Sequence, residues 1–384
     1  MKPIPYGKQF IDESDIKSVS RSLAKELITT GPLVKKFEEK LSSYFNSKKS
    51  HVCSSGTAAI HLALMSLNLK KNDVILMPAI NFIASFNIAR LMDLKVYLVD
   101  VDQYTGQTTP KKIEECIKKN KLKNVKAVII MHHGGYPQFL NEYYLLKKKY
   151  NFFIIEDACH ALGAEYFYNK KIFKIGSCKH SDICTFSLHP VKTITTGEGG
   201  IVTTNNKKIS DKIKLLRSHG INRNSKQYWK YDILEHGLNY RLSDINCALG
   251  LSQLKKVNYL LSKRKKIFLK YKRELKDLSP YLKIPYYSDS VKGSHHLFIV
   301  NIMFNKIKKN KDDFIKYLNR NNIFPQYHYI PIYKFSVYKK TKNKLSGSEK
   351  FYKNSVSIPI YPSLKTKEQN NILRVIKDYF KFFY

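Results

Sequence analysis

The stretch FFIIEDACH, residues 152–160, carries the pattern on which the expected fold rests. Phe152–Ile155 form a short, uninterrupted apolar run, and the acidic pair Glu156 and Asp157 follows at once. An apolar run of this length without alternation is typical of a strand that is buried on both faces of a parallel sheet. We therefore expect a buried strand whose carboxyl end carries acidic side chains.

Helical patterns and short apolar runs alternate on both sides of this strand, from about residue 50 to residue 205. Further strands are predicted at Val74–Met77, Lys95–Val101, Ala127–Met131, Ile183–Ser187 and Gly200–Thr204. Helices are predicted over residues 57–69, 82–93, 110–120 and 137–149. This alternation indicates an α/β fold with a mostly parallel sheet that is flanked by helices on both faces.

The C-terminal third of the chain has a different pattern. Residues 243–276 are predicted to form a long helix or a helix pair that leads out of the first unit. A strand pattern at His296–Phe304 then mixes with helical patterns at 311–320 and 367–380. We predict a large domain over residues 1–255 and a smaller C-terminal α+β domain over residues 256–384.

The formal net charge of +38 invites a nucleic-acid interpretation. Only nine of the 68 basic residues are arginine, the residue that phosphate and guanine recognition favours. The lysines are scattered in twos and threes, and the chain is also rich in other residues with A/T-rich codons. Genome base composition explains this excess more simply than a ligand does, so we expect no nucleic-acid partner.

No membrane segment or leader is expected either. The longest uncharged run, Val74–Ala89, is 16 residues long and contains Pro78, Asn81 and Asn87, so it is too short and too polar to span a bilayer. The N-terminal residues lack the apolar core of a secretory signal. We expect a cytoplasmic protein.

The six cysteines indicate neither a disulfide framework nor a metal site. They are spread over the chain without a C-x-x-C pair, which fits a reducing compartment. Cys178, His180, Cys184 and His189 lie close together in sequence, but their spacing matches no familiar zinc motif. Buried thiols are the simpler interpretation, and we expect no metal.

The motif SLHPVKTITTGEGG, residues 187–200, places Lys192 a few residues beyond an apolar strand that ends near Ser187. Ligands gather at such strand ends in open α/β sheets. A lysine that is held there and desolvated becomes a nucleophile able to form a Schiff base. The alternative, a lysine on an ordinary surface turn, stays open on this segment alone.

Two further segments favour a bound cofactor. SSGTAA, residues 54–59, leads from an apolar run into a helix, where free N–H groups and hydroxyls form a phosphate cradle or an ordinary N-cap. Asp157 stands at the end of its strand, and two interpretations of it are open. It is a partner for a protonated ring nitrogen or a helix-capping residue. A phosphate cradle, a ring-nitrogen carboxylate and a strand-end lysine, in this order, specify pyridoxal phosphate.

The whole chain resembles the sugar-nucleotide aminotransferases of the DegT/StrS type, which have the fold-type I architecture of aspartate aminotransferase. The motifs that carry this resemblance are SSGTAA (54–59), NFIAS (81–85), EDACHALGA (156–164), SLHPVK (187–192), TGEGG (196–200) and GLNYRL (237–242).

The resemblance implies a role for each matched residue. Lys192 would carry the cofactor and shuttle the proton, Asp157 would pair with the pyridine nitrogen, and Phe82 would stack on the ring. Phosphate contacts are implied for Gly56, Thr57 and Ser187, and for Asn239 from a second subunit of a homodimer. His160 departs from the glutamine of most of the family, but it could equally bond the phenolic oxygen of the cofactor.

One branch of the family, the transaminases of pseudaminic acid biosynthesis, is similar in RSHGI (217–221), EHGLNYRL (235–242) and QYHYIPIY (326–333). That likeness implies a nucleotide-sugar cleft, to which an N-terminal arm contributes. The implied lining residues are Tyr6, Glu26, Leu27, Ile28, Thr29, Tyr327, His328, Tyr329 and Ile330. From the residues alone, these aromatic and histidine side chains fit stacking on a uracil or an ordinary core.

The implied reaction transfers an amino group from L-glutamate to UDP-2-acetamido-2,6-dideoxy-β-L-arabino-hex-4-ulose. It is a ping-pong cycle with pyridoxamine phosphate as the intermediate. Arg241 is a candidate for the glutamate carboxylate. The alternatives are another 3-keto or 4-keto sugar acceptor, a sugar dehydratase, in which a histidine replaces the lysine, and a binding module that kept the fold. The presence of Lys192 favours transamination.

Overall fold

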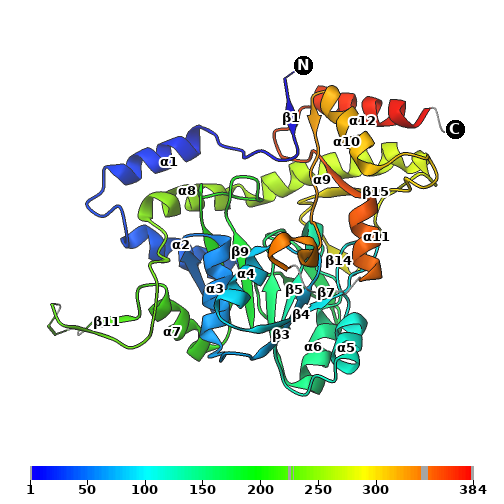
Figure 1. The fold of residues 1–384 in the computed structure, drawn as a ribbon. Coiled ribbons are helices and arrows are strands. Elements are labelled where there is room, and N and C mark those ends of the chain that lie inside the picture. The colour runs from blue at the N-terminus through cyan, green and yellow to red at the C-terminus, as the bar shows by residue number, and fades with distance from the viewer. Residues whose placement is uncertain (1, 224–225, 228, 339–344, 382–384) are drawn as a thin grey trace.

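The computed structural model describes residues 2–223, 226–227, 229–338 and 345–381. Figure 1 shows a large sheet with helices around it and, beyond the long helix α9 (Val257–Leu275), a second group of helices and strands near both termini. None of the helices in these ranges is long and apolar enough to cross a membrane.

The large sheet has seven strands in the order β2-β10-β9-β6-β5-β3-β4. β10 is antiparallel to both of its neighbours, and the other neighbouring pairs are parallel. The strands are β2 (Lys49–Cys53), β3 (Val74–Pro78), β4 (Lys95–Val99), β5 (Val125–Met131), β6 (Phe153–Asp157), β9 (Ile183–Ser187) and β10 (Gly200–Thr204). The predicted α/β fold with a mostly parallel sheet is confirmed.

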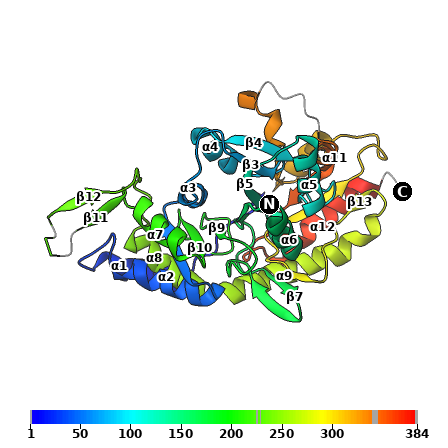
Figure 2. The ribbon, with the colours of Figure 1, turned by 90° about the horizontal axis from the view of Figure 1, so that it is seen from below.

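Helices cover both faces of this sheet, as Figure 2 shows. One face packs on a core that includes Phe37 and Leu41 of α2 and Ile113 of α5. The other face packs on a core that includes Ala59 of α3 and Ile213 of α7. The helices of this part are α1 (Glu13–Leu23), α2 (Pro32–Phe45), α3 (Gly56–Ser66), α4 (Ala84–Leu91), α5 (Pro110–Lys119), α6 (Leu140–Tyr150), α7 (Lys207–Leu216) and α8 (Asp244–Lys255), with the 3-10 turn η1 (His133–Gly135).

The C-terminal part has its own hydrophobic core, in which Tyr271 of α9 meets Phe298 of a three-stranded sheet. That sheet has the order β13-β15-β17. The elements here are β13 (Leu282–Lys283), β15 (Phe298–Ile302), β16 (Ile323–Phe324), β17 (Ser355–Ile358), α10 (Lys311–Arg320), α11 (Ser346–Asn354) and α12 (Thr366–Phe380), with the 3-10 turns η2 (Lys276–Leu278), η3 (Ile332–Lys334) and η4 (Ser336–Tyr338). The division between residues 255 and 256 stays a prediction.

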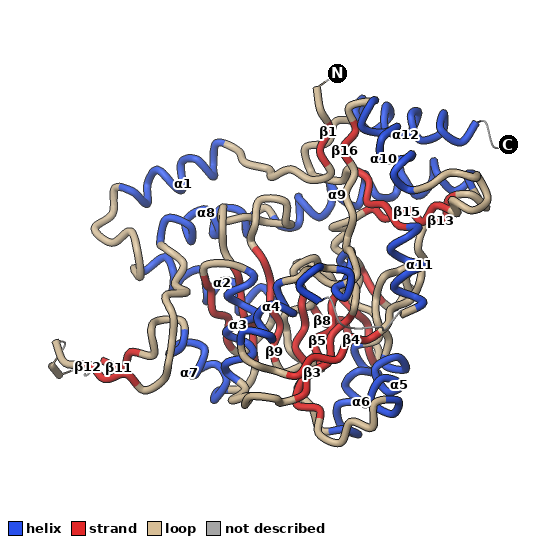
Figure 3. The backbone as a smooth tube through the Cα atoms, in the orientation of Figure 1, coloured by secondary structure: helices blue, strands red, loops and turns tan. Residues whose placement is uncertain are grey.

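Several elements were not predicted from the sequence. β1 (Ile4–Pro5) pairs with β16 of the C-terminal part, so the N-terminal arm crosses to it. β7 (Glu165–Tyr168), β8 (Lys171–Lys174) and β14 (Val291–Lys292) form a small sheet, and β11 (Ile221–Arg223) pairs with β12 (Tyr231–Ile233). These strands are short, as the red segments β1, β11 and β12 show in Figure 3. They are also partly exposed, so they lack the apolar runs that mark the central strands.

Candidate active site

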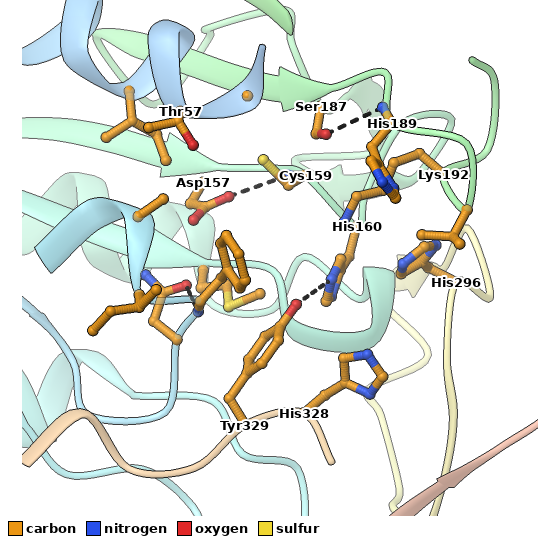
Figure 4. Close-up of a pocket in the computed structure, with 18 of the residues that line it drawn as sticks. Thr57, Asp157, Cys159, His160, Ser187, His189, Lys192, His296, His328 and Tyr329 are labelled. Atoms are coloured by element: carbon orange, nitrogen blue, oxygen red, sulfur yellow. Dashed lines mark hydrogen bonds between the residues drawn. The ribbon is translucent and has the colours of Figure 1, made fainter. Parts of the chain in front are cut away.

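A cavity of about 530 Å³ lies at the carboxyl ends of the central strands, against residues 326–330 of the C-terminal part (Figure 4). The register brings these ends together, because Asp157 of β6 pairs with Met131 of β5 and Thr185 of β9. Of the predicted site residues, those that line the cavity are Tyr6, Gly56, Thr57, Phe82, Asp157, His160, Ser187, Lys192, Tyr327, His328, Tyr329 and Ile330.

Asp157 is the last residue of β6, and its side chain is buried. The backbone N–H of Cys159 donates to its Oδ1 at 3.3 Å, and the Ser85 hydroxyl donates to its Oδ2 at 3.4 Å. Asp157 is therefore an oriented acceptor at the floor of the cavity, and it can hold a protonated nitrogen.

Lys192 lies in the loop that follows β9, where its backbone N–H donates to the carbonyl of His189 at 2.9 Å. Its side chain is half-buried and lines the cavity. Burial lowers the pKa of the Lys192 amine, Cys159 and Asp157 oppose this, and the positive charge of Arg264 adds the smallest contribution, which lowers the pKa. A lowered pKa raises the fraction of neutral amine, which is the nucleophilic form.

The start of α3 approaches the end of β9 closely. Ser55 caps the helix by accepting from the Ala58 N–H at 3.0 Å. A Cβ placed on Gly56 would lie only 2.8 Å from the Cβ of Ser187, so no larger residue fits there without a shift. Together with the Thr57 and Ser187 side chains on the cavity wall, the free N–H groups of this helix start form an anion cradle.

Four histidines gather beside Lys192. The His160 ring lies 4.3 Å from that of His296, 6.0 Å from that of His133 and 6.1 Å from that of His328. Burial, the neighbouring imidazoles and the charge of Lys192 hold the pKa values of His160 and His296 well below the usual range. Both rings are therefore neutral at physiological pH, and His160 carries no charge that could tune a bound group.

Tyr329 connects this cluster to the aromatic wall of the cavity. Its hydroxyl lies 2.9 Å from Nε2 of His160, and its ring centroid lies 5.8 Å from that of Phe82. Phe82 has no neighbour over about half of its surface, with 53% of the residue exposed. An exposed ring at a cavity wall is a platform on which a planar molecule can stack.

The structure does not bring all the predicted residues to this cavity. Glu26–Thr29 lie between α1 and α2 and are exposed, and Asn239 is an exposed residue whose backbone pairs with Ser218. Neither these residues nor Arg241 are among those that line the cavity of the single chain. Their roles stay predictions.

Other lining residues escaped sequence reasoning, among them Asn81, Cys159, His189, Glu198, His296 and Gln326. Most of these residues stand inside motifs that were recognised, so the motifs could have pointed to them as cavity residues. They are Asn81, Cys159, His189 and Glu198. His296 had no such signal, because only the fold places it against His160.

The model of one protein family matches residues 9–377, almost the entire chain, and its description is the DegT/DnrJ/EryC1/StrS aminotransferase family. The chain belongs to this family. The expected family and activity class are thereby confirmed, and the enzyme is an aminotransferase.

Individual members of this aminotransferase family are similar over their full length. A Campylobacter jejuni protein (serotype O:23/36) named UDP-4-amino-4,6-dideoxy-N-acetyl-beta-L-altrosamine transaminase is 40% identical over 367 residues, which cover 95% of this chain and 94% of that protein. The solved structure of Helicobacter pylori PseC, described as an aminotransferase of pseudoaminic acid biosynthesis, matches with a TM-score of 0.88 and 29% identity and covers 99% of this chain and 100% of its own. The putative sugar aminotransferase Spr1654 from Streptococcus pneumoniae, in its PLP form, matches with a TM-score of 0.89 and 25% identity over 100% of both chains.

Proposed function

We propose that this aminotransferase uses pyridoxal phosphate to transfer the amino group of L-glutamate to UDP-2-acetamido-2,6-dideoxy-β-L-arabino-hex-4-ulose. The product would be the UDP-4-amino sugar named in the Campylobacter jejuni relative. The observation that carries the proposal is one cavity that contains a buried carboxylate, a lysine with a lowered pKa and an anion cradle.

The residues of the cavity fit pyridoxal phosphate. The close approach of Gly56 to Ser187 leaves room for a phosphate at the backbone N–H groups of the helix start and beside the Thr57 hydroxyl. The Ser187 hydroxyl accepts from the His189 N–H at 3.3 Å and can still donate to the phosphate. Asp157 would hold the ring nitrogen, and Phe82 would cover one face of the ring. The amine of Lys192 would bind the aldehyde carbon of the cofactor. The Streptococcus pneumoniae relative supports this choice, since its solved structure is described as a PLP form.

When bound, pyridoxal phosphate supplies an electron-withdrawing ring and an aldehyde carbon that carries the amino group between the two substrates. Asp157 would accept a hydrogen bond from the protonated ring nitrogen, because the Cys159 N–H and the Ser85 hydroxyl hold its carboxyl group in place at the cavity wall. The Lys192 Nζ, as a neutral amine, would take a proton from one carbon and, as the resulting ammonium group, would donate it to the next. The neutral imidazole of His160, in contact with Tyr329, offers a hydrogen bond to the phenolic oxygen without adding charge.

The sugar-nucleotide cleft would be the outer part of the same cavity. Tyr6 and Tyr327–Ile330 line it, and the Tyr6 ring lies 5.3 Å from that of His328. The pairing of β1 with β16 holds Tyr6 beside these residues. Aromatic and histidine side chains of this kind fit a uracil ring and a diphosphate.

A second copy of the chain would complete the site. Asn239 and Glu26–Thr29 are exposed. Exposed apolar side chains occur within or close in sequence to these segments, namely Leu27, Ile28, Tyr231, Ile233 and Leu238. Figure 1 shows the α1–α2 connection and the β11–β12 hairpin on the same side of the molecule. We propose a homodimer in which this side of one subunit brings Asn239 and Glu26–Thr29 to the cavity of the other.

The proposal is tested with a panel of nucleotide keto sugars and glutamate labelled with ¹⁵N. Mass spectrometry should detect the label in the UDP-4-amino sugar, and the Lys192→Ala variant should give none. If the label enters only a 3-amino sugar, or a sugar on another nucleotide, the acceptor is wrong although the reaction class holds. If no sugar is aminated while glutamate is still converted to 2-oxoglutarate, the assignment to nucleotide sugars is refuted.

A further inference from the structure

A second cavity of about 520 Å³ is lined by residues none of which lines the active-site cavity. We call it the rear cavity. Residues of α9, of the strands β7, β8 and β14 and of α2 line it, and Figure 2 shows β7 beside α9. The lining residues are Tyr44, Gly163, Glu165, Lys174, Asn258, Leu261, Ser262, Lys265, Lys292, Gly293 and His295. Its volume is within the range of about 300–1,000 Å³ that is typical of small-molecule sites.

The rear cavity has an excess of positive charge. Lys292 pairs with Glu165 at 3.0 Å, and Lys174 donates to the carbonyl of Tyr44 at 3.0 Å and lies over the Tyr44 ring. Lys265 has no ion pair or hydrogen bond within the described part of the chain, although it is close enough to lower the pKa of His295. The cavity thus has three lysines and a single carboxylate, and Lys265 has no ion pair or hydrogen bond with another described residue.

The lining of this cavity combines polar and apolar side chains. Asn258, Ser262 and Lys265 project from one side of α9 as donors, while Leu261 and the Tyr44 ring provide apolar surface. A cation and amide or hydroxyl donors beside an apolar wall fit an oxyanion on a compact carbon body.

One short segment joins the rear cavity to the active site. Gly293 and His295 line the rear cavity, whereas the Ser294 hydroxyl donates to the carbonyl of His160 at 2.5 Å and His296 lines the active-site cavity. His295 has φ +54°, in the left-handed region that non-glycine residues seldom adopt. A 2.8 Å hydrogen bond between its Nδ1 and the Tyr136 hydroxyl holds it there.

We propose that the rear cavity binds a small organic anion, a carboxylate or a phosphate ester, and that its occupancy shifts the active site through residues 293–296. A ligand that contacts His295 acts on a residue whose immediate neighbours both touch His160. The coupling to the active site rests on the proposed function, but the binding does not.

Isothermal titration calorimetry on the holoenzyme tests the binding, with citrate and glucose 1-phosphate as probes at constant ionic strength. The wild type should bind one of them with one site per chain. Lys265→Met should weaken this binding about tenfold, as the loss of one charge-assisted hydrogen bond predicts. Lys266→Met is the matched control, because Lys266 is the next residue on the same helix, is exposed as Lys265 is, and does not line the cavity.

Equal weakening in both variants would show that the general positive charge attracts the anion, and it would overturn the proposal. Binding of neither probe by the wild type would overturn it as well. Whichever probe binds decides between a carboxylate and a phosphate source.

The coupling has its own readout. A saturating probe should shift the visible absorbance band of the bound cofactor in the wild type and in Lys266→Met, but not at the same concentration in Lys265→Met. Binding without any shift would refute the link through residues 293–296. If the protein binds the probe but takes up no pyridoxal phosphate, the proposed function is refuted. The proposed anion site is then still supported, because its evidence is the binding of the probe.

Discussion

Replacement of Arg264 by methionine should destabilise the protein and raise the pKa of Lys192. The Arg264 side chain is buried in α9, 1% exposed. Its Nη1 donates to the carbonyls of His296 at 3.2 Å and Ile360 at 3.0 Å, and its Nη2 donates to the carbonyl of Val191 at 3.1 Å. Val191 precedes Lys192, so this guanidinium connects the lysine loop to the C-terminal part.

The size of the effect follows from these three bonds. A hydrogen bond from a charged donor contributes about 1.5–3 kcal/mol, so three contribute roughly 6 kcal/mol. Desolvation of the guanidinium, which also lowers its pKa to about 10, offsets several kcal/mol of this. Methionine keeps the apolar stem, so we expect Arg264→Met to lower the free energy of unfolding by about 3 kcal/mol.

Urea denaturation of the cofactor-free protein measures this loss. Arg273→Met is the control, because Arg273 lies on the same helix, is exposed, and forms a surface ion pair with Glu274. That variant should change the free energy of unfolding by less than about 0.5 kcal/mol. Equal losses in the two variants would refute the stabilising role of Arg264.

The same substitution has a consequence for reactivity. Burial is the largest cause of the lowered pKa of Lys192, Cys159 and Asp157 oppose it, and the charge of Arg264 lowers the pKa by a smaller amount. Without that charge the pKa rises, so less of the amine is neutral at a given pH. The rate at which pyridoxal phosphate loads, followed by visible absorbance, should therefore reach its plateau at a higher pH in Arg264→Met than in Arg273→Met. Coincident pH profiles would contradict the electrostatic effect.

Three further predictions concern the site. Lys192→Ala should bind pyridoxal phosphate without a covalent bond and lose turnover by several orders of magnitude, and near-native turnover in a steady-state assay would be incompatible with its role. Asp157→Asn should keep the cofactor but slow the half-reaction with glutamate, because an amide cannot keep the ring nitrogen protonated; single-turnover rates within about twofold of the wild type would disprove this. Co-refolded Lys192→Ala and Asn239→Ala chains, each nearly inactive alone, should regain about a quarter of the wild-type sites if Asn239 acts across the dimer. Inactive mixtures in which mass measurements show hybrids would mean that it does not.

Local signals in the sequence predicted much of the central sheet and of the cofactor cavity. Apolar runs mark β3, β5 and β6, and Asp157 stands where such a run ends, so periodicity and polarity suffice to place it. Ser187 and Lys192 follow the same rule at β9. Strand ends gather at one edge of a parallel sheet, which is why residues distant in sequence could be assigned to one cavity.

The remaining residues depend on contacts that no local pattern contains. Arg264 is one basic residue in a lysine-rich helix, and only the packing of α9 against the Lys192 loop gives it three carbonyl partners. His296 lies in an expected strand region, but only the fold places its ring 4.3 Å from that of His160. Asn239 and Glu26–Thr29 are exposed in the single chain, so their roles depend on a second copy.

The most direct test of the central claim is the reduction of the holoenzyme with borohydride, followed by digestion and peptide mass spectrometry. Reduction fixes the cofactor to the amine that carries it. We predict that the pyridoxyl label appears on the peptide that contains Lys192 and on no other, and that Lys192→Ala takes up none. A label on another of the 59 lysines, or on none in the wild type, would contradict the account.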